Sequence, residues 1–164
     1  MPDRSSLAPA GSLTSDSPAR TRELGRALGR LATPGTLLAL IGPLGAGKTE
    51  LTKGVAEGLN VPSVVNSPTF VLMNEHQGRL RLFHVDAYRL DDASEARDAG
   101  LLDERQASGV TVIEWADRLD GWLPAERLQI ELVPDAAEPE RRTFRWRAGD
   151  EAHARLAQGA LAGS

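Results

Sequence analysis

The sequence predicts an α/β fold in which helices flank a mostly parallel central sheet. Two observations carry this prediction. The apolar run 36–41 shows no alternation, which is typical of a strand buried on both faces of a parallel sheet. After the glycine-rich segment that follows it, Leu51, Val55 and Leu59 recur at the spacing of one helix face. A buried strand, a turn and an amphipathic helix in this order belong to a βαβ unit, whose strands lie parallel.

Local patterns predict the elements on either side of this unit. Ser17 followed by Pro18 is typical of a helix start, and we expect that helix to end at the Pro-Gly pair 34–35. Residues 70–75 and 80–85 are two strand-like runs on either side of a Gln-Gly turn. They therefore predict an antiparallel hairpin.

The second half of the chain predicts further strands. The spacing of Asp92 and Glu95 is typical of a short capped helix, and the β-branched run 110–113 predicts another buried strand. Two later segments alternate apolar and polar residues. They predict a closing antiparallel pair at the sheet edge. Their apolar positions are Leu128, Ile130, Leu132, Phe144 and Trp146.

Length and composition predict a single domain. The chain has 164 residues, of which 41% are hydrophobic and 26% are charged, and this supplies enough apolar surface for one core. Residues 1–16 are rich in Ser, Pro, Ala and Gly, so we expect a disordered tail there. The domain is expected over residues 17–150, followed at 151–164 by a short helix or a C-terminal tail.

Composition also narrows the functional classes. The absence of cysteine excludes disulfides, thiolate metal sites and cysteine nucleophiles, and it favours a cytoplasmic location. No stretch approaches the roughly 18 apolar residues of a membrane span, so we expect neither secretion nor membrane insertion. A net charge of −4 argues against a free-standing nucleic-acid binder, and any role with RNA is expected to run through a protein partner. The arginines of residues 141–147 are interpreted as the solvated face of a terminal strand.

Residues 42–49, Gly-Pro-Leu-Gly-Ala-Gly-Lys-Thr, match the P-loop motif G-x-x-x-x-G-K-[ST] in its required context of a buried strand before and a helix after. The glycines let backbone N–H groups point at phosphates, and the helix N-terminus adds a favourable dipole. Lys48 is expected to reach the β- and γ-phosphates, and Thr49 is expected to coordinate magnesium. The predicted nucleotide-binding residues of this segment are Gly42, Pro43, Leu44, Gly45, Ala46, Gly47, Lys48, Thr49 and Glu50.

Two carboxylates end predicted apolar strands. Asp86 follows the run 80–85 in a Walker B pattern, and Glu114 follows the run 110–113. Ligands of parallel sheets bind at the carboxyl ends of the strands, so we expect both carboxylates beside the P-loop. The predicted metal ligands are Thr49, Asp86 and Glu114, and the predicted catalytic residues are Lys48, Asp86 and Glu114. Which carboxylate binds the metal directly stays open.

Residue type and context give further candidates. Thr69, in a Ser-Pro-Thr-Phe loop, is a candidate switch residue that senses the γ-phosphate and magnesium. His84 either positions water or phosphate or is structural. Trp115 and Trp122 are interpreted as core or partner-contact residues. The absence of an N-K-x-D sequence removes the usual evidence for guanine recognition.

Four motifs, in one order, give the chain a family resemblance. They are Gly-Ala-Gly-Lys-Thr at 45–49, Ser-Pro-Thr-Phe at 67–70, His-Val-Asp-Ala-Tyr-Arg at 84–89 and Ile-Glu-Trp at 113–115. With these motifs the chain resembles the TsaE (YjeE) family of bacterial P-loop ATPases, which are needed to make threonylcarbamoyladenosine in tRNA. The P-loop alone is shared by very many proteins, whereas the four motifs together are specific.

The resemblance implies a P-loop NTPase fold and an ATPase that uses Mg²⁺ and acts on the TsaB and TsaD proteins. Those proteins modify the adenosine beside the anticodon, in tRNAs that read codons beginning with A, so tRNA is met only through the complex. The resemblance implies that Lys48 and Thr49 bind triphosphate and magnesium, and that Asp86 is the Walker B acid. It also implies that Thr69 belongs to the switch loop and that Glu114 supports metal binding or hydrolysis.

Two residues depart from the family pattern. Pro43 stands where the family loop usually has Asp, and Glu50 replaces the usual Thr or Ser. Proline removes a backbone N–H together with the carboxylate, and Glu50 cannot donate a hydroxyl hydrogen to the α-phosphate. We therefore expect weaker nucleotide affinity or slower turnover than in a Pro43→Asp, Glu50→Thr variant.

Two other functions stay open at this point. A small-molecule kinase shares the P-loop, but it usually needs an arginine-rich lid, for which the chain offers only Arg89, Arg97 and Arg105. A nucleotide-gated binding module with vestigial hydrolysis would keep its function after mutation of Asp86. The sequence shows no obvious arginine finger, which favours weak intrinsic hydrolysis that a partner stimulates.

Overall fold

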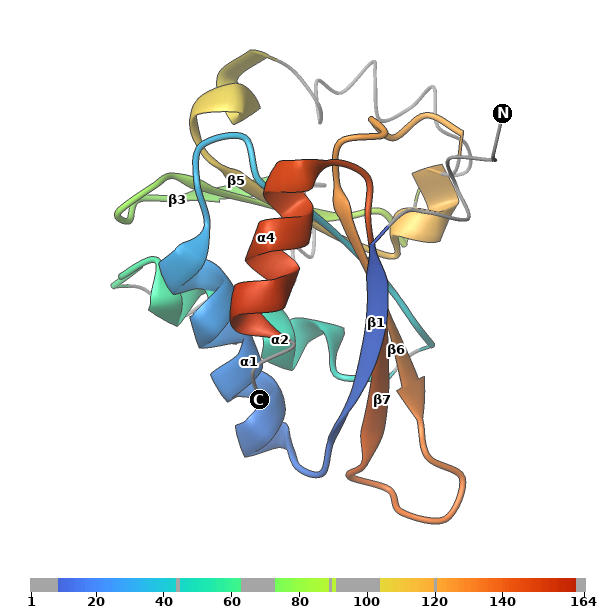
Figure 1. The fold of residues 1–164 in the computed structure, drawn as a ribbon. Helices are drawn as coiled ribbons and strands as arrows, with labels where there is room; N and C mark the ends of the chain where they lie inside the picture. The colour runs from blue at the N-terminus through green and yellow to red at the C-terminus, as the bar shows by residue number, and fades with distance from the viewer. Residues whose placement is uncertain are drawn as a thin grey trace.

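A computed structural model describes residues 9–43, 45–62, 73–88, 90, 104–119 and 121–161. Within these residues, seven strands form one sheet and three α-helices cover one of its faces (Figure 1). The strands are β1 (Ala10–Ser15), β2 (Leu37–Ile41), β3 (Met73–His76), β4 (Leu82–Asp86), β5 (Val110–Glu114), β6 (Leu128–Pro134) and β7 (Arg142–Ala148). The helices are α1 (Pro18–Leu31), α2 (Lys48–Gly58) and α4 (Glu151–Ala160), with short 3-10 helices η2 (Glu104–Ser108) and η3 (Ala116–Leu119).

The strand order is β1-β7-β6-β2-β5-β4-β3. The inner strands β6, β2, β5 and β4 pair in parallel, whereas β3, β7 and β1 pair antiparallel at the two sides. The predicted fold class, with its mostly parallel centre and its β3–β4 hairpin, is confirmed. The predicted antiparallel pair β6–β7 also forms, but its expected position at the sheet edge is wrong, because β1 pairs with the outer side of β7.

The register of the inner strands brings three strand ends to one edge of the sheet. Asp86, at the end of β4, pairs with Glu114 at the end of β5, and Glu114 pairs with Leu40 of β2. The chain leaves β2 directly into residues 42–49. The P-loop motif and both predicted carboxylates therefore share the carboxyl edge.

Strand β2 is buried on both faces. Leu38 and Leu40 belong to the core that packs beneath the three helices, and Leu37 and Ala39 belong to a second core, with η3, on the opposite face. Burial on both faces is the physical reason for the unalternating apolar run in the sequence.

Helix α1 begins as the sequence predicts. Ser17 is its N-cap, Pro18 is its first residue, and the Ser17 side chain accepts a hydrogen bond of 3.1 Å from the backbone N–H of Arg20. This bond satisfies one of the N–H groups that a helix leaves unpaired at its start.

Glycines bring α1 and α2 into backbone contact. A Cβ atom on Gly29 would lie 2.3 Å from the carbonyl oxygen of Val55 and 2.9 Å from the Cα atom of Gly58. Gly25 and Gly54 face each other in the same way, with 2.9 Å between an added Cβ on either residue and the Cα of the other. The contact holds α2, and the P-loop that leads into it, firmly against α1.

The ordered fold extends beyond the predicted domain at both ends. Residues 10–15 form β1 rather than a disordered tail, because they pair with β7 along its full length. An edge strand draws its stability from this backbone pairing and needs few apolar residues, so its polar sequence was misleading. At the other end, α4 packs into the core through Leu156 and Ala157, so the helix was the correct alternative and the boundary at 150 was too early.

Several predictions fall on residues outside the described ranges. These are the tail 1–8, Leu44, Thr69 and its loop, and the short helix near 92–95. Among the helices that the structure describes, none has the length and apolarity needed to cross a membrane.

Candidate functional site

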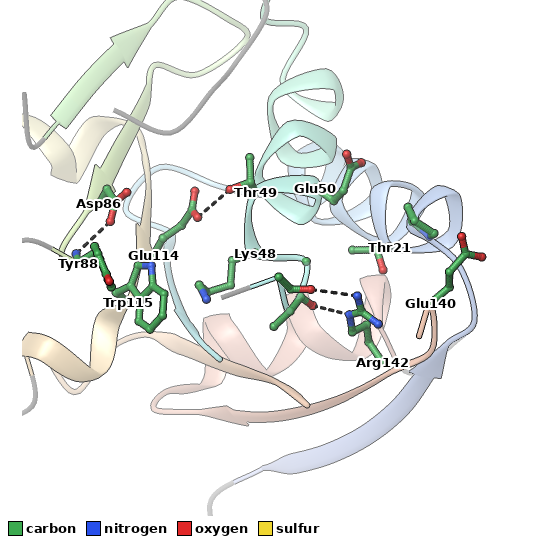
Figure 2. Close-up of a pocket in the computed structure, with 14 residues that line it drawn as sticks. Thr21, Lys48, Thr49, Glu50, Asp86, Tyr88, Glu114, Trp115, Glu140 and Arg142 are labelled. Atoms are coloured by element: carbon green, nitrogen blue, oxygen red, sulfur yellow. Dashed lines mark hydrogen bonds between the residues drawn. The ribbon is translucent and has the colours of Figure 1, made fainter. Parts of the chain in front are cut away.

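A cavity of about 440 Å³ opens at the carboxyl edge of the sheet (Figure 2). The start of α1, the P-loop, the ends of β4 and β5, and the β6–β7 hairpin all contribute to its walls. Its lining residues are Pro18, Thr21, Gly45, Ala46, Gly47, Lys48, Thr49, Glu50, Asp86, Tyr88, Glu114, Trp115, Glu140 and Arg142.

The backbone of the P-loop curls tightly before α2. Gly45 and Gly47 have φ angles of +79° and +103°, conformations that residues with a side chain rarely adopt. Gly47 is the N-cap of α2 and provides no side-chain cap, so the start of the helix can direct its N–H groups at a ligand. Such a helix start favours an anion.

Lys48 lies at the bottom of the cavity and is almost fully buried. Its ammonium group donates to the carbonyl oxygens of Gly42, at 2.5 Å, and Pro43, at 2.9 Å. It also lies 3.9 Å from the centroid of the Trp115 ring. Burial lowers the pKa of Lys48, and the nearby carboxylates, led by Glu114, partly oppose that shift.

Trp115 occupies an unusual backbone position for a bulky residue. Its φ angle is +59°, in the left-handed region, which is strained for an aromatic side chain. The ring packs against Tyr88, with 4.8 Å between ring centroids, and the Lys48 ammonium lies over its face. Trp115 therefore lines the cavity and, like Trp122, packs against the core beside η3.

Glu114 connects Thr49 to His84. The Thr49 hydroxyl donates to Glu114 Oε1 at 3.0 Å, and His84 Nε2 lies 2.5 Å from Glu114 Oε2. Glu114 is 2% exposed and His84 is fully buried. Within the described chain His84 Nδ1 has no hydrogen-bond partner, so the neutral ring with its proton on Nε2 leaves no buried N–H unsatisfied. His84 thus lies behind Glu114 and does not line the cavity.

Asp86 lies beside Glu114 and lines the cavity. Its Oδ1 atom accepts a hydrogen bond of 2.9 Å from the backbone N–H of Tyr88. This bond turns the chain sharply after β4 and places Tyr88, with half of its surface exposed, at the cavity mouth.

The donor atoms around Thr49 fit a magnesium ion. Mg²⁺ prefers oxygen ligands, takes one or two carboxylates from the protein, and completes its shell with phosphates and water. Thr49, Asp86 and Glu114 supply a hydroxyl and two carboxylates along one wall of the cavity. No group of three or more acidic, histidine or cysteine side chains that would form an all-protein metal cage occurs in the described ranges.

Glu50 lines the cavity near the start of α2, but its carboxylate is paired. Arg22 of α1 binds it through Nε and Nη2, with bonds of 3.0 and 3.1 Å. The arginine neutralises the charge that Glu50 brings close to the expected phosphate position.

Arg142 is a cavity residue that the sequence interpretation missed. Its guanidinium donates to the carbonyl oxygens of Gly45, at 2.9 Å, and Ala46, at 3.0 Å (Figure 2). The interpretation of residues 141–147 as a solvated face holds for the exposed Arg145 and Arg147 but is wrong for Arg142. Alternation within the strand was the available signal, because Arg142 has the same parity as the buried Phe144.

The other residues that sequence reasoning missed are Pro18, Thr21, Tyr88 and Glu140. No local motif marks Pro18, Thr21 or Glu140, because they reach the cavity only through the packing of α1 and of the β6–β7 hairpin. Leu44 and Thr69 lie outside the described residues, so their predicted roles stay predictions.

A scan against protein-family models matches residues 15–143 to the TsaE family, described as threonylcarbamoyl adenosine biosynthesis protein TsaE. Curated relatives carry the name tRNA threonylcarbamoyladenosine biosynthesis protein TsaE. The protein of Bacillus subtilis is 45% identical over 125 residues, 76% of this chain and 77% of the relative. The protein of Treponema pallidum is 40% identical over 112 residues, 68% of this chain and 83% of the relative.

A solved structure agrees with the sequence matches. The crystal structure of Bacillus subtilis YdiB superposes with a TM-score of 0.74 at 29% identity, covering 95% of this chain and 97% of that one. The family match spans most of the chain, and the relatives exceed a third identity over more than two thirds of it. The chain therefore belongs to the TsaE family of threonylcarbamoyladenosine biosynthesis proteins.

Proposed function

We propose that this protein binds ATP with Mg²⁺ in the cavity, hydrolyses it slowly, and thereby acts on the TsaB and TsaD proteins in tRNA threonylcarbamoyladenosine synthesis. One observation carries the proposal. Lys48, Thr49, Asp86 and Glu114 line a single cavity, next to the start of α2. These are the parts that phosphoryl-transfer sites of this class require.

The phosphates would lie over the P-loop. The N–H groups at the start of α2 and the Lys48 ammonium supply positive charge there. In the structure Lys48 donates to carbonyl oxygens of its own loop, and phosphate oxygens would take over those bonds. Its low exposure keeps the exchange away from bulk water, which strengthens the interaction with phosphate.

Thr49, Glu114 and Asp86 would hold the magnesium ion or its water ligands. Bound magnesium neutralises charge that develops on the transferred phosphoryl group. Glu114 is held at one oxygen by His84, so its other oxygen keeps a fixed direction toward Thr49. Asp86 pairs with Glu114 across the neighbouring strands, so it would share the ion or orient the attacking water.

The nucleoside would occupy the opposite end of the cavity. The magnesium residues Asp86 and Glu114 lie at one end, and Pro18, Thr21 and Glu140 line the other. These side chains belong to the start of α1 and to the β6–β7 hairpin, which the described structure brings together beside Gly47.

Weak intrinsic hydrolysis is part of the proposal. Among the described residues, Arg142 is the arginine that lines the cavity, and its guanidinium is engaged by backbone carbonyls. A partner that supplies or orders a further positive group would accelerate the reaction. The net charge of −4 fits a protein that meets tRNA through its partners rather than directly.

Pro43 and Glu50 are expected to weaken nucleotide binding. Pro43 offers a carbonyl but no N–H to the loop, and Glu50 is tied to Arg22 and cannot donate to phosphate. A Pro43→Asp, Glu50→Thr variant should bind ATP more tightly or turn over faster. Equal affinity and rate would refute this part of the proposal.

The test is phosphate release from ATP by the purified protein, with and without TsaB and TsaD of the same organism. Strong stimulation by the partners, lost in Lys48→Ala, is the expected result. Transfer of phosphate to a metabolite without stimulation would favour a kinase instead. Full support of the tRNA modification by an Asp86→Ala variant that no longer hydrolyses ATP would favour a binding module.

A further inference from the structure

Arg142 differs from the other arginines of β7 in the direction it faces. Arg145 and Arg147 are exposed on the open face of the sheet, and the Arg145 side chain is 66% exposed. Arg142 has the opposite parity and is half-buried at the cavity. It lies at the first position of β7, beside the hairpin, from which its side chain reaches the P-loop (Figure 2).

The whole guanidinium of Arg142 is bound to backbone carbonyls. Nε donates to Ala46 O at 3.0 Å and Nη2 donates to Gly45 O at 2.9 Å, while Nη1 donates to the carbonyls of Pro139 and Arg141 in its own hairpin. Among the described residues no carboxylate forms an ion pair with it. Its positive charge therefore remains available to the cavity that it lines.

The two P-loop carbonyls determine where two N–H groups point. In a trans peptide the C=O and the N–H lie on opposite sides, so fixing the oxygens of Gly45 and Ala46 fixes the N–H groups of Ala46 and Gly47. The Ala46 N–H closes the loop on Pro43 O at 3.1 Å. The Gly47 N–H belongs to the N-cap of α2, at the end where an anion would bind.

The loop needs such an external brace. Gly45 and Gly47 both have positive φ and no side chain, and a Cβ on Gly45 would find no atom within 4 Å. Packing therefore does not immobilise Gly45, although the next residue, Ala46, is buried in the core. Glycine gives this part of the loop a large conformational entropy. Pro43 has already removed one N–H from the loop, so the direction of the remaining N–H groups matters more.

We infer that Arg142 is a positioning residue that clamps the P-loop in its phosphate-binding conformation and adds positive charge to the site. The inference rests on the proposed function only for the identity of the ligand, ATP. The clamp itself is a property of the nucleotide-free protein. It links the β6–β7 hairpin to the P-loop, 96 residues away in sequence.

The experiment compares Arg142→Met and Arg142→Lys with Arg145→Met, which removes the same charge from the same strand on the open face. Amide hydrogen exchange of residues 45–47 is measured in the nucleotide-free proteins, and ATP affinity and the hydrolysis rate at saturation are measured separately. We expect Arg142→Met to speed exchange at these amides by about tenfold and to weaken ATP binding by about tenfold, the loss of roughly one charge-assisted hydrogen bond. Amide exchange elsewhere in the protein, and the rate of hydrolysis at saturating ATP, should each change by less than about twofold. A general folding defect would change both by more.

The control variants show whether Arg142 acts by holding the P-loop carbonyls or through its positive charge alone. Lysine keeps the charge but cannot span both carbonyls, so Arg142→Lys should bind ATP with intermediate affinity and exchange as fast as Arg142→Met. Unchanged exchange in Arg142→Met, wild-type behaviour of Arg142→Lys, or an equal effect of Arg145→Met would overturn the inference. If the wild-type protein binds no ATP, the proposed function fails, while the exchange data still decide whether Arg142 clamps the loop.

Discussion

Two walls of the cavity are held in different ways. On the strand-end wall, which consists of Asp86 and Glu114, the buried carboxylate of Glu114 is fixed by Thr49 and by His84, which lies behind it. On the hairpin wall, which consists of Glu140, Arg142 and P-loop residues 45–47, a half-buried arginine is bonded to backbone carbonyls. The first wall positions acidic groups and the second positions N–H groups. The comparison suggests a division of labour, with chemistry on the strand-end wall and phosphate binding on the hairpin wall.

The largest expected effect comes from a substitution in the strand-end wall. Glu114→Gln should lower ATP hydrolysis by about 100-fold or more, because the carboxylate that aids metal binding and water activation is lost. ATP affinity at saturating Mg²⁺ should change far less, since the hairpin wall is intact. Steady-state phosphate release and calorimetric ATP titration measure the two quantities, with the exposed Glu138→Gln as control. A loss of affinity as large as the loss of rate would contradict the division of labour.

The next effect concerns the helix pair α1–α2, which supports the P-loop at the start of α2. Gly54→Ala should lower the free energy of unfolding by about 1–3 kcal/mol, because the added methyl would lie 2.2 Å from the carbonyl oxygen of Arg22 and the helices must move apart. Urea unfolding measures it. Gly159→Ala in α4 is the matched control, because its new methyl meets only the end of the Leu31 side chain, at 3.0 Å. Equal stability of the two variants would show that the α1–α2 contact is loose in solution.

A smaller effect tests the support that His84 gives to Glu114 from behind the strand-end wall. His84→Phe should raise the Mg²⁺ concentration needed for tight ATP binding by about tenfold, because an outer partner orients the carboxylate that faces the metal. His84→Gln, which keeps an N–H donor, should recover much of this loss. Mg²⁺ dependence of ATP binding is the measurement, and ATP binding without Mg²⁺ should stay the same. Failure of glutamine to recover the Mg²⁺ dependence while the variant stays folded would make His84 a packing residue only.

The smallest effect lies outside both walls, at the start of α4. Asp150 caps α4 through the backbone N–H of His153, at 2.9 Å, and also binds the His153 ring. Desolvation would raise the pKa of Asp150, but the hydrogen bonds from the backbone and the ring of His153 outweigh it and hold the pKa below its usual range. A depressed folded-state pKa means that the stabilisation is present above about pH 4 and is lost as the pH falls through the folded-state pKa.

Asp150→Ala should therefore lower stability by about 1 kcal/mol at pH 7, the usual cost of a lost N-cap, and by less at pH 2. Urea unfolding at the two pH values measures this. ATP affinity at pH 7 should not change, because Asp150 lines neither wall. The same stability loss at both pH values would show that the Asp150 charge plays no part.

The contrast between the strand-end wall and the hairpin wall also explains which site residues the sequence could predict. Asp86 and Glu114 were found because each ends an apolar run, and parallel strands bring such ends together whatever the rest of the chain does. Arg142 was missed because its contact with Ala46 depends on how the β6–β7 hairpin packs against the P-loop. Only the strand parity shared with Phe144 hinted at it. Strand β1 was missed because an edge strand is specified by its partner β7 rather than by its own apolar pattern.

The most direct test of the account is calorimetric titration of the protein with ATP in the presence and absence of Mg²⁺, using Lys48→Ala and the control Lys53→Ala, which alters a lysine on the same helix outside the cavity. The account predicts Mg²⁺-dependent binding of one ATP by the wild type and by Lys53→Ala, and loss of binding in Lys48→Ala. Absence of binding in the wild type, or equal binding by Lys48→Ala, would contradict the assignment of this cavity as the ATP site.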